Sequence, residues 1–272
     1  MIGLLTEQKH LLGARLRALT PSVLCFAVLS ALFCSPAWAD ASPDLSPGIT
    51  LGQQWLRGIE TRDPGRLQAL FDQGYDQPDL ATEKGKTALM VAAQAGDLSL
   101  CEALLRAGAD VNLSNENGGS PLMHAAVGGN LAIVSLMLAR GAAVDSQAVN
   151  GWSAITLAAA KGFTPIVEIL LSAGANPNLN DIFGWSPLMH AVEQNRAAIV
   201  ELFLAQGEVE INVRNNDGVT ALHRAAALGY LDIARSLIQA GARTDLQDRT
   251  GRTPLDYARQ AGNQDLFENM VE

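Results

Sequence analysis

Glycine recurs at a fixed spacing through most of this 272-residue chain, and this spacing limits the possible folds more than any other feature. One series, with successive gaps of 33, 33, 33, 34 and 33 residues, consists of Gly85, Gly118, Gly151, Gly184, Gly218 and Gly251. Two further glycine series start at Gly96 and Gly108 and follow the same period. Such self-similarity is typical of a repeat protein in which every copy is one supersecondary unit.

Each copy carries the residues of two short helices. A hydroxyl residue stands where a helix N-cap is needed, two positions after the first glycine: Thr87, Ser120, Ser153, Ser186, Thr220 and Thr253. Pro or Ala follows it, as suits the first position of a helix. The second and third glycines are predicted to end the two helices in left-handed turns, and Asn195 replaces one of them. The pattern predicts an all-α solenoid with short β-hairpin-like loops between helix pairs.

These segments resemble ankyrin repeats. The resemblance is carried by Gly85-Lys86-Thr87-Ala88-Leu89, Gly118-Gly119-Ser120-Pro121-Leu122 and Gly218-Val219-Thr220-Ala221-Leu222-His223. It covers residues 82–272 in about six copies, of which the last is truncated and polar enough to act as a C-terminal cap. Residues 51–81 have apolar helical faces but lack the Thr-Pro-Leu element, so we interpret them as a degenerate N-terminal capping repeat. Caps are required because each repeat buries its apolar face only against its neighbours.

The N-terminus has the pattern of a secretory signal peptide over residues 1–39. Basic residues precede an apolar run over residues 23–34, and the triplet Ala37-Trp38-Ala39 stands before Asp40. The run is shorter than the ~20 residues that a spanning helix needs, so we expect cleavage between Ala39 and Asp40 and a secreted or periplasmic protein. An uncleaved membrane anchor is the alternative. Acylation at Cys34 is disfavoured because Phe33 precedes it. Residues 40–50, rich in Pro, Ser and Asp, read as a linker.

Charge and composition narrow the choice of partner. The chain has 19 basic and 28 acidic residues, a net charge of −9, and removal of residues 1–39 takes away three basic and one acidic residue to leave −11. An acidic chain without a basic stripe argues against a nucleic-acid partner, because phosphate neutralisation needs clustered Lys and Arg. Only 5% of the residues are aromatic, which argues against a large aromatic-lined substrate cavity.

The sequence shows no spacing that indicates catalysis, a metal or a cofactor. His124, His190 and His223 fall on the first helices of three different copies, and helix layers ~8–10 Å apart cannot bring such residues to one ion. Asn115 and Asn117 only weakly resemble a calcium loop. The resemblance implies that His223 bonds to its turn. Cys101 is expected in the core rather than as a redox-active thiol. We therefore predict a non-enzymatic protein without a cofactor.

The resemblance implies that hairpin tips and first helices form the binding side. Trp152 and Trp185 lie one period apart, and Ile182 and Phe183 extend an apolar patch beside them. We expect both indoles to face outward as contacts for a partner. The alternative is that each indole only covers its neighbouring hairpin. The other predicted contact residues are Lys161, Glu193 and Gln194, which would form a polar rim, and Leu228.

Together these features predict an exported, monomeric scaffold that binds a protein partner and contacts the membrane only through its N-terminal segment. A membrane-tethered adaptor and a regulatory or stress-protective accessory to an extracytoplasmic enzyme are the alternatives. A third alternative is that the repeat array itself contains an enzymatic or metal-binding site. Some exported bacterial ankyrin proteins support oxidative-stress or toxin–immunity systems, but nothing in the sequence selects either.

Overall fold

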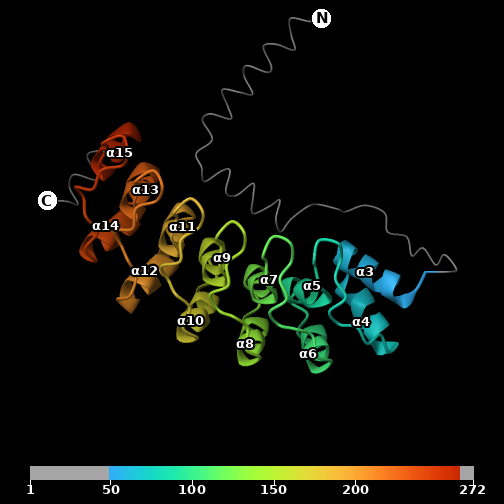
Figure 1. Cartoon of the computed structure of the whole chain (residues 1–272). Helices are drawn as coiled ribbons and strands as arrows, with labels where there is room; N and C mark the ends of the chain where they lie inside the picture. Colours follow the sequence, from blue (N-terminus) through green and yellow to red (C-terminus); the bar gives the residue numbers. More distant parts are fainter. Residues whose placement is uncertain (1–48, 264–272) are drawn as a thin grey trace, which may run out of the picture. The chain divides into compact units, whose positions relative to one another are not determined.

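The computed structural model describes residues 49–263, which fold into the helices of a repeat solenoid (Figure 1). The thirteen helices of this range are α3 (Leu51–Thr61), α4 (Pro64–Asp72), α5 (Ala88–Ala95), α6 (Leu98–Arg106), α7 (Pro121–Gly128), α8 (Leu131–Ala139), α9 (Ala154–Lys161), α10 (Thr164–Ser172), α11 (Pro187–Glu193), α12 (Ala197–Gln206), α13 (Ala221–Leu228), α14 (Leu231–Gln239) and α15 (Pro254–Gln260). The predicted signal peptide, residues 40–48 of the linker and the end of the sixth copy lie outside the described residues.

The helices stand in two rows, and the array is curved (Figure 1). The first helices of the copies, α5, α7, α9, α11 and α13, form the inner, concave row, and α6, α8, α10, α12 and α14 form the outer row. The N-terminal helices α3 and α4 pack on one another and on α5. Among the described residues, no helix is long and apolar enough to cross a bilayer. The all-α solenoid predicted from the sequence is confirmed.

Local capping explains why each first helix begins and ends where it does. All six predicted hydroxyl residues are N-caps, and the side chain of each accepts a hydrogen bond from the backbone N–H three residues later. Gly96, Gly129, Gly162 and Gly229 cap the C-termini in the left-handed conformation. Asn195 adopts it too, with φ 54°. The same residue types therefore fix the start of all six first helices and the end of the four that glycine caps.

The core lies between the two rows and consists of aliphatic side chains and small residues. The alanine pairs of the inner helices, such as Ala92-Ala93 and Ala158-Ala159, have no exposed surface, so neighbouring helices approach closely. Cys101 on α6 is fully buried, and burial, helped by nearby Asp97, raises the pKa of its thiol to about 12. The thiol is therefore protonated and packs as an apolar group, as predicted.

Candidate protein-binding surface

Six hairpins project from one edge of the array and are bonded to one another. Within each hairpin a backbone N–H donates to the carbonyl four residues later, as from Ala148 to Trp152 and from Asp181 to Trp185. Each tip also bonds to the next, as when Ile182 N–H donates to the Asn150 carbonyl at 3.1 Å. A Cβ on Gly151 would lie 2.6 Å from the Asp181 Cα, so only glycine fits there. The hairpin tips therefore form a continuous row in which successive copies stand side by side.

Trp152 and Trp185 lie at the bases of two adjacent hairpins and are buried. Their exposed fractions are 4% and 7%, and their rings lie 4.4 and 5.4 Å from the imidazole of His190, between centroids. The expectation that both indoles face outward is therefore wrong. The alternative describes the structure, because each indole covers the inner helices and buries its large apolar surface within the chain.

Asp181 holds this layer together, and the sequence analysis missed it. Its Oδ1 accepts the backbone N–H groups of Phe183 and Trp185, both at 2.9 Å, and its Oδ2 lies 3.0 Å from His190 Nε2. The same carboxylate thus shapes the hairpin and orients the imidazole that touches both indoles. The available signal was the recurrence of Asn or Asp at this position, as Asn115, Asn215 and Asp248, because these side chains close tight turns.

Glu193, predicted as part of an exposed rim, takes part in a buried ion pair instead. Its carboxylate lies 2.7 Å from the guanidinium of Arg224 on the next inner helix, and the side chains are 9% and 12% exposed. The Arg224 guanidinium also lies over the Trp185 ring, 5.7 Å from its centroid. Lys161 and Gln194 are half-buried and Leu228 is 36% exposed. These side chains lie on the inner helices or directly after them, but the polar rim is smaller than expected.

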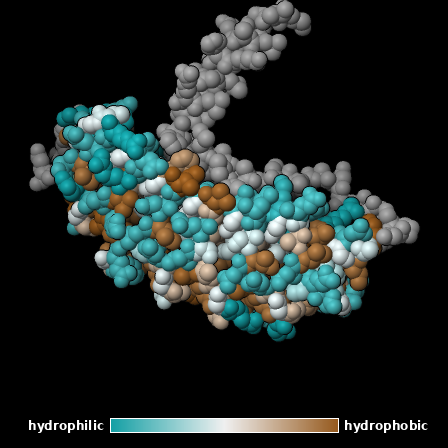
Figure 2. Space-filling view, in the orientation of Figure 1, coloured by the Kyte–Doolittle hydropathy of each residue, from teal (hydrophilic) through white to brown (hydrophobic). Residues whose placement is uncertain are grey.

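The tips of the third and fourth hairpins carry apolar side chains that are open to solvent. Val149 is 73% exposed, Ile182 56% and Phe183 53%. We call these three residues the apolar tip patch. Figure 2 shows hydrophobic surface at the upper edge of the array, near α9 and α11. Ile182 and Phe183 were predicted as contact residues and are exposed as expected, while Val149 extends the patch to the preceding tip.

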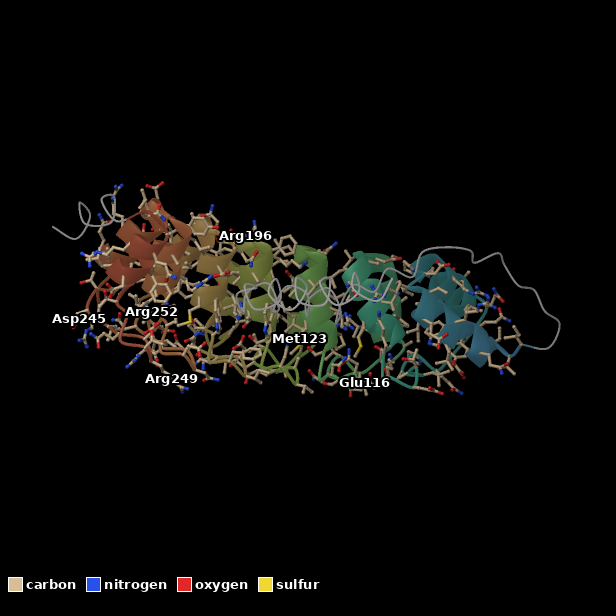
Figure 3. All side chains as sticks on the ribbon, turned by 90° about the horizontal axis from the view of Figure 1, so that it is seen from above. Glu116, Met123, Arg196, Asp245, Arg249 and Arg252 are labelled. Carbon is tan, nitrogen blue, oxygen red and sulfur yellow. The ribbon has the colours of Figure 1, made fainter. Side chains whose placement is uncertain are left out.

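The hairpins on either side of this patch are polar. Figure 3 shows Glu116 and Arg249 on the same edge of the array, where the hairpin tips lie, and Arg196 on the opposite edge. Exposed Asn216 and Asp217 stand at the tip that follows Phe183. The apolar tip patch is thus bounded by an acidic residue at the preceding copy and by amide and carboxylate groups at the next.

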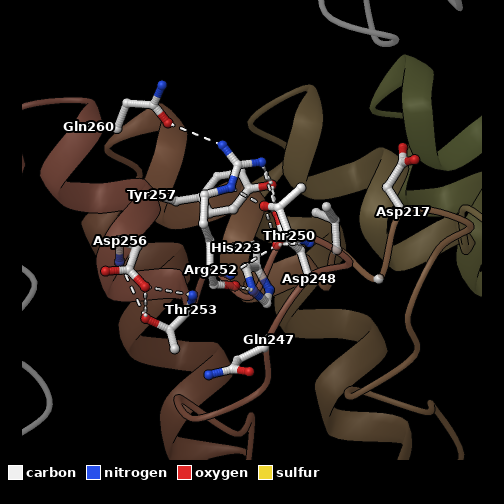
Figure 4. Close-up of polar contacts among 12 residues, drawn as sticks. Asp217, His223, Gln247, Asp248, Thr250, Arg252, Thr253, Asp256, Tyr257 and Gln260 are labelled. Carbon is white, nitrogen blue, oxygen red and sulfur yellow. Dashed lines mark hydrogen bonds and ion pairs between the residues drawn. The ribbon is translucent and has the colours of Figure 1, made fainter.

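The last described hairpin is held by a polar network that fills the place of the tryptophans (Figure 4). Arg252, at the position of Trp152 and Trp185, donates to Asp248 Oδ2 at 2.8 Å and to the Tyr257 hydroxyl at 2.9 Å. Burial alone would raise the pKa of Asp248, but hydrogen bonds from its neighbours outweigh that effect and hold the pKa well below its usual range. His223 Nδ1 accepts the Thr220 backbone N–H at 3.1 Å, the turn bond that the resemblance implied.

A pocket of about 220 Å³ opens at the other end of the array and is lined by Arg62, Val91, Gln94 and Ala95. Arg62 ends α3 with φ 56°, at the position where later copies carry the capping Gly or Asn. A left-handed backbone costs a residue other than glycine about 1 kcal/mol, so the arginine is not the most stable choice there. Lys86, at the base of the first hairpin, is half-buried beside it.

His124 lies behind this pocket in its neutral form. Burial, reinforced by Lys86 and Arg62, lowers its pKa to about 3. Nδ1 lies 3.3 Å from Gln94 Oε1 and Nε2 lies 3.5 Å from Asn115 Nδ2, so one ring nitrogen donates and the other accepts. Among the described residues, no group of three or more His, Cys, Asp or Glu could hold a metal ion.

The stacked helix pairs and the bonded row of hairpins define a helical repeat solenoid. The sequence model described as ankyrin repeats (3 copies) matches five overlapping segments that together span residues 61–272. The chain therefore belongs to the ankyrin-repeat family. A solved structure of the predatory endopeptidase Bd0816 from Bdellovibrio bacteriovorus in complex with immunity protein Bd3460 contains a similar chain, with 32% identity and a TM-score of 0.62. The match covers 70% of this chain and 97% of that one.

Two curated relatives are similar over short segments only. The human ARF GTPase-activating protein GIT1 is 49% identical over 55 residues, which are 20% of this chain and 7% of that protein. The potassium channel AKT1 of Oryza sativa subsp. indica is 42% identical over 57 residues, or 21% of this chain and 6% of the channel. The chain thus spans a small fraction of the length of these relatives.

Proposed function

We propose that this ankyrin-repeat protein is an exported, non-enzymatic scaffold that binds a protein partner through its hairpin tips and inner helices. The observation that carries the proposal is the apolar tip patch, in which three large side chains on adjacent tips are each more than half exposed. Apolar and aromatic side chains that stand in a polar surrounding are typical of binding hot spots. The ankyrin-repeat family supports a role in protein–protein interaction.

An extracytoplasmic enzyme is the partner class that we favour. The similar solved chain belongs to a complex of an endopeptidase with an immunity protein, and its match covers nearly all of that chain. A regulatory or protective accessory to such an enzyme fits the signal-like N-terminus of this chain. The role expected of this chain is to bind and restrain the enzyme without itself turning over substrate.

The binding test uses crosslinking and affinity capture from the native compartment. We expect Ile182→Ser/Phe183→Ser to weaken partner binding ~10-fold or more, because each residue would lose an apolar contact worth about 1 kcal/mol or more. Leu131→Ser is the matched control, since Leu131 is 42% exposed but lies on α8 in the outer row. Equal capture of every partner by both variants and the wild type would refute the proposed surface.

Export is tested separately by the mass of the protein recovered from cells. Cleavage of the predicted signal peptide gives a chain that begins at Asp40. A chain that retains residues 1–39 in the membrane fraction would instead favour the tethered adaptor. An inhibition assay on the captured partner then tests the favoured partner class, since a restrained enzyme loses activity when the scaffold is added.

A further inference from the structure

Two unusual cationic residues lie at the N-terminal end of the array, Arg62 in the wall of the pocket and Lys86 near Arg62. Arg62 occupies a left-handed position, at which the later copies carry glycine or, in one copy, Asn195. Its side chain therefore stands at the pocket although the backbone there favours glycine. Lys86 is half-buried, and its ammonium group has no ion-pair partner among the described residues.

Two cationic side chains, Arg62 and Lys86, lie close enough to repel one another at this corner of an acidic chain. Burial, reinforced by the positive charge of Arg62, lowers the pKa of Lys86 to about 8. The chain as a whole has a net charge of −9, yet two cationic groups share this corner. Arg62 is exposed and Lys86 is half-buried, and two like charges held close together are stabilised by an anion placed between them.

The walls of the pocket indicate what kind of anion fits. Arg62 and Gln94 line it with a guanidinium and an amide, while Val91 and Ala95 supply apolar surface. A guanidinium can bind both oxygens of a carboxylate, and the apolar walls suit the aliphatic stem of an acidic side chain. The Gln94 side chain is oriented by a hydrogen bond between its Oε1 and His124 Nδ1, 3.3 Å apart.

We propose that the pocket lined by Arg62, Val91, Gln94 and Ala95, with Lys86 beside it, binds a carboxylate group presented by the protein partner. The identity of the donor rests on the proposed function, whereas the affinity of the pocket for a carboxylate does not. Three of its lining residues, Val91, Gln94 and Ala95, belong to α5. Helix α5 stands in the row of inner helices (Figure 1). A partner that lies along this row would place one acidic side chain in the pocket.

The test follows the Lys86 side chain by NMR in the purified protein, with acetate as the probe. Bound carboxylate favours the charged ammonium, so the Lys86 pKa should rise from about 8 toward its ordinary value of 10.5 as acetate saturates the site. Lys84, exposed at the tip of the same hairpin, is the internal control and should not respond. Sodium chloride at equal ionic strength should have a much smaller effect.

Arg62→Gly is the decisive variant, because it restores the residue that the backbone prefers and should not impair folding. We expect it to abolish the acetate response and to raise the Lys86 pKa in the absence of acetate. The proposal is overturned if acetate acts no differently from chloride, or if the response persists in Arg62→Gly. Inorganic phosphate acting more strongly than acetate would assign the pocket to phosphate instead of a carboxylate.

The acetate test and the test of the proposed function can succeed or fail independently. Acetate binding is measured without any partner, so a saturable response stands even if the Ile182/Phe183 variant retains every partner. Conversely, loss of partner binding in that variant, together with an inert pocket, would keep the scaffold function and reject only the carboxylate site.

Discussion

The base and the tip of the fourth hairpin are two residues apart and have opposite environments. Trp185 at the base is 7% exposed and packs beside His190 and Arg224, whereas Phe183 at the tip is 53% exposed. Both are aromatic, and both backbone N–H groups donate to Asp181 Oδ1 at 2.9 Å. The difference therefore comes from the direction of each side chain, with the base aimed at the inner helices and the tip aimed away from them.

This contrast separates residues that hold the array together from residues that are available to a partner. A ring at the base is stabilised by contacts within the chain, so it belongs to the fold. A ring at the tip makes few contacts within the chain, so a partner can cover it without breaking contacts that stabilise the fold. Variants at the base of a hairpin should therefore change the free energy of unfolding, and variants at its tip should change the affinity for the partner.

Removal of the base ring should have the largest effect on stability. We expect Trp185→Ala to lower the free energy of unfolding by about 3 kcal/mol, because it deletes a large buried side chain and leaves a cavity beside His190. Denaturant unfolding followed by circular dichroism measures it. Trp152→Ala is the companion variant and should behave alike. A loss below about 1 kcal/mol for both would mean that the indoles contribute little to the fold and would reopen their role as contacts.

A buried histidine on another inner helix, His124 on α7, predicts a dependence of the unfolding free energy on pH. His124 is neutral in the fold, with a pKa lowered to about 3, while the unfolded chain has the ordinary value of 6.5. The unfolded state therefore binds the extra proton first, and stability falls as the pH drops below about 6.5. Between pH 7 and 5 this histidine should account for a loss of about 2 kcal/mol.

The matched variant for this effect is His124→Leu, because Leu157 occupies the same position in the next copy. Unfolding free energies of the wild type and the variant are compared at pH 7 and pH 5. The wild type should lose about 2 kcal/mol more than the variant over this range. Parallel losses in the two proteins would show that His124 becomes protonated without unfolding the array.

The sequence was sufficient to predict the elements that recur in every copy. Caps, glycine turns and buried alanines repeat at the same period, so one repeated pattern predicted the helix pairs of the five described copies and the first helix of the sixth. Asn195 was correctly predicted in the left-handed turn because it stands in a glycine series. The periodic part of the sequence thus determined the scaffold.

The surface could not be predicted in the same way because it depends on side chains that do not repeat. Trp152 and Trp185 are buried and both contact His190, and nothing in their own spacing reveals that contact. Glu193 is buried only because Arg224 occurs one copy later, on the next inner helix. Contacts between unlike residues of neighbouring copies require the geometry of the stack, which the repeat pattern leaves open.

The smallest effect on stability is expected at the tip. The stability of the tip variant determines whether weaker partner binding can be attributed to a lost contact. Ile182→Ser/Phe183→Ser should change the free energy of unfolding by no more than about 0.5 kcal/mol, because both side chains are more than half exposed. The backbone bonds of this tip, such as Ile182 N–H to the Asn150 carbonyl, do not involve the replaced atoms. Thermal and denaturant unfolding measure the change. If it exceeded about 1.5 kcal/mol, the tip would belong to the fold as the base does, and weaker partner binding would then reflect a damaged array rather than a lost contact.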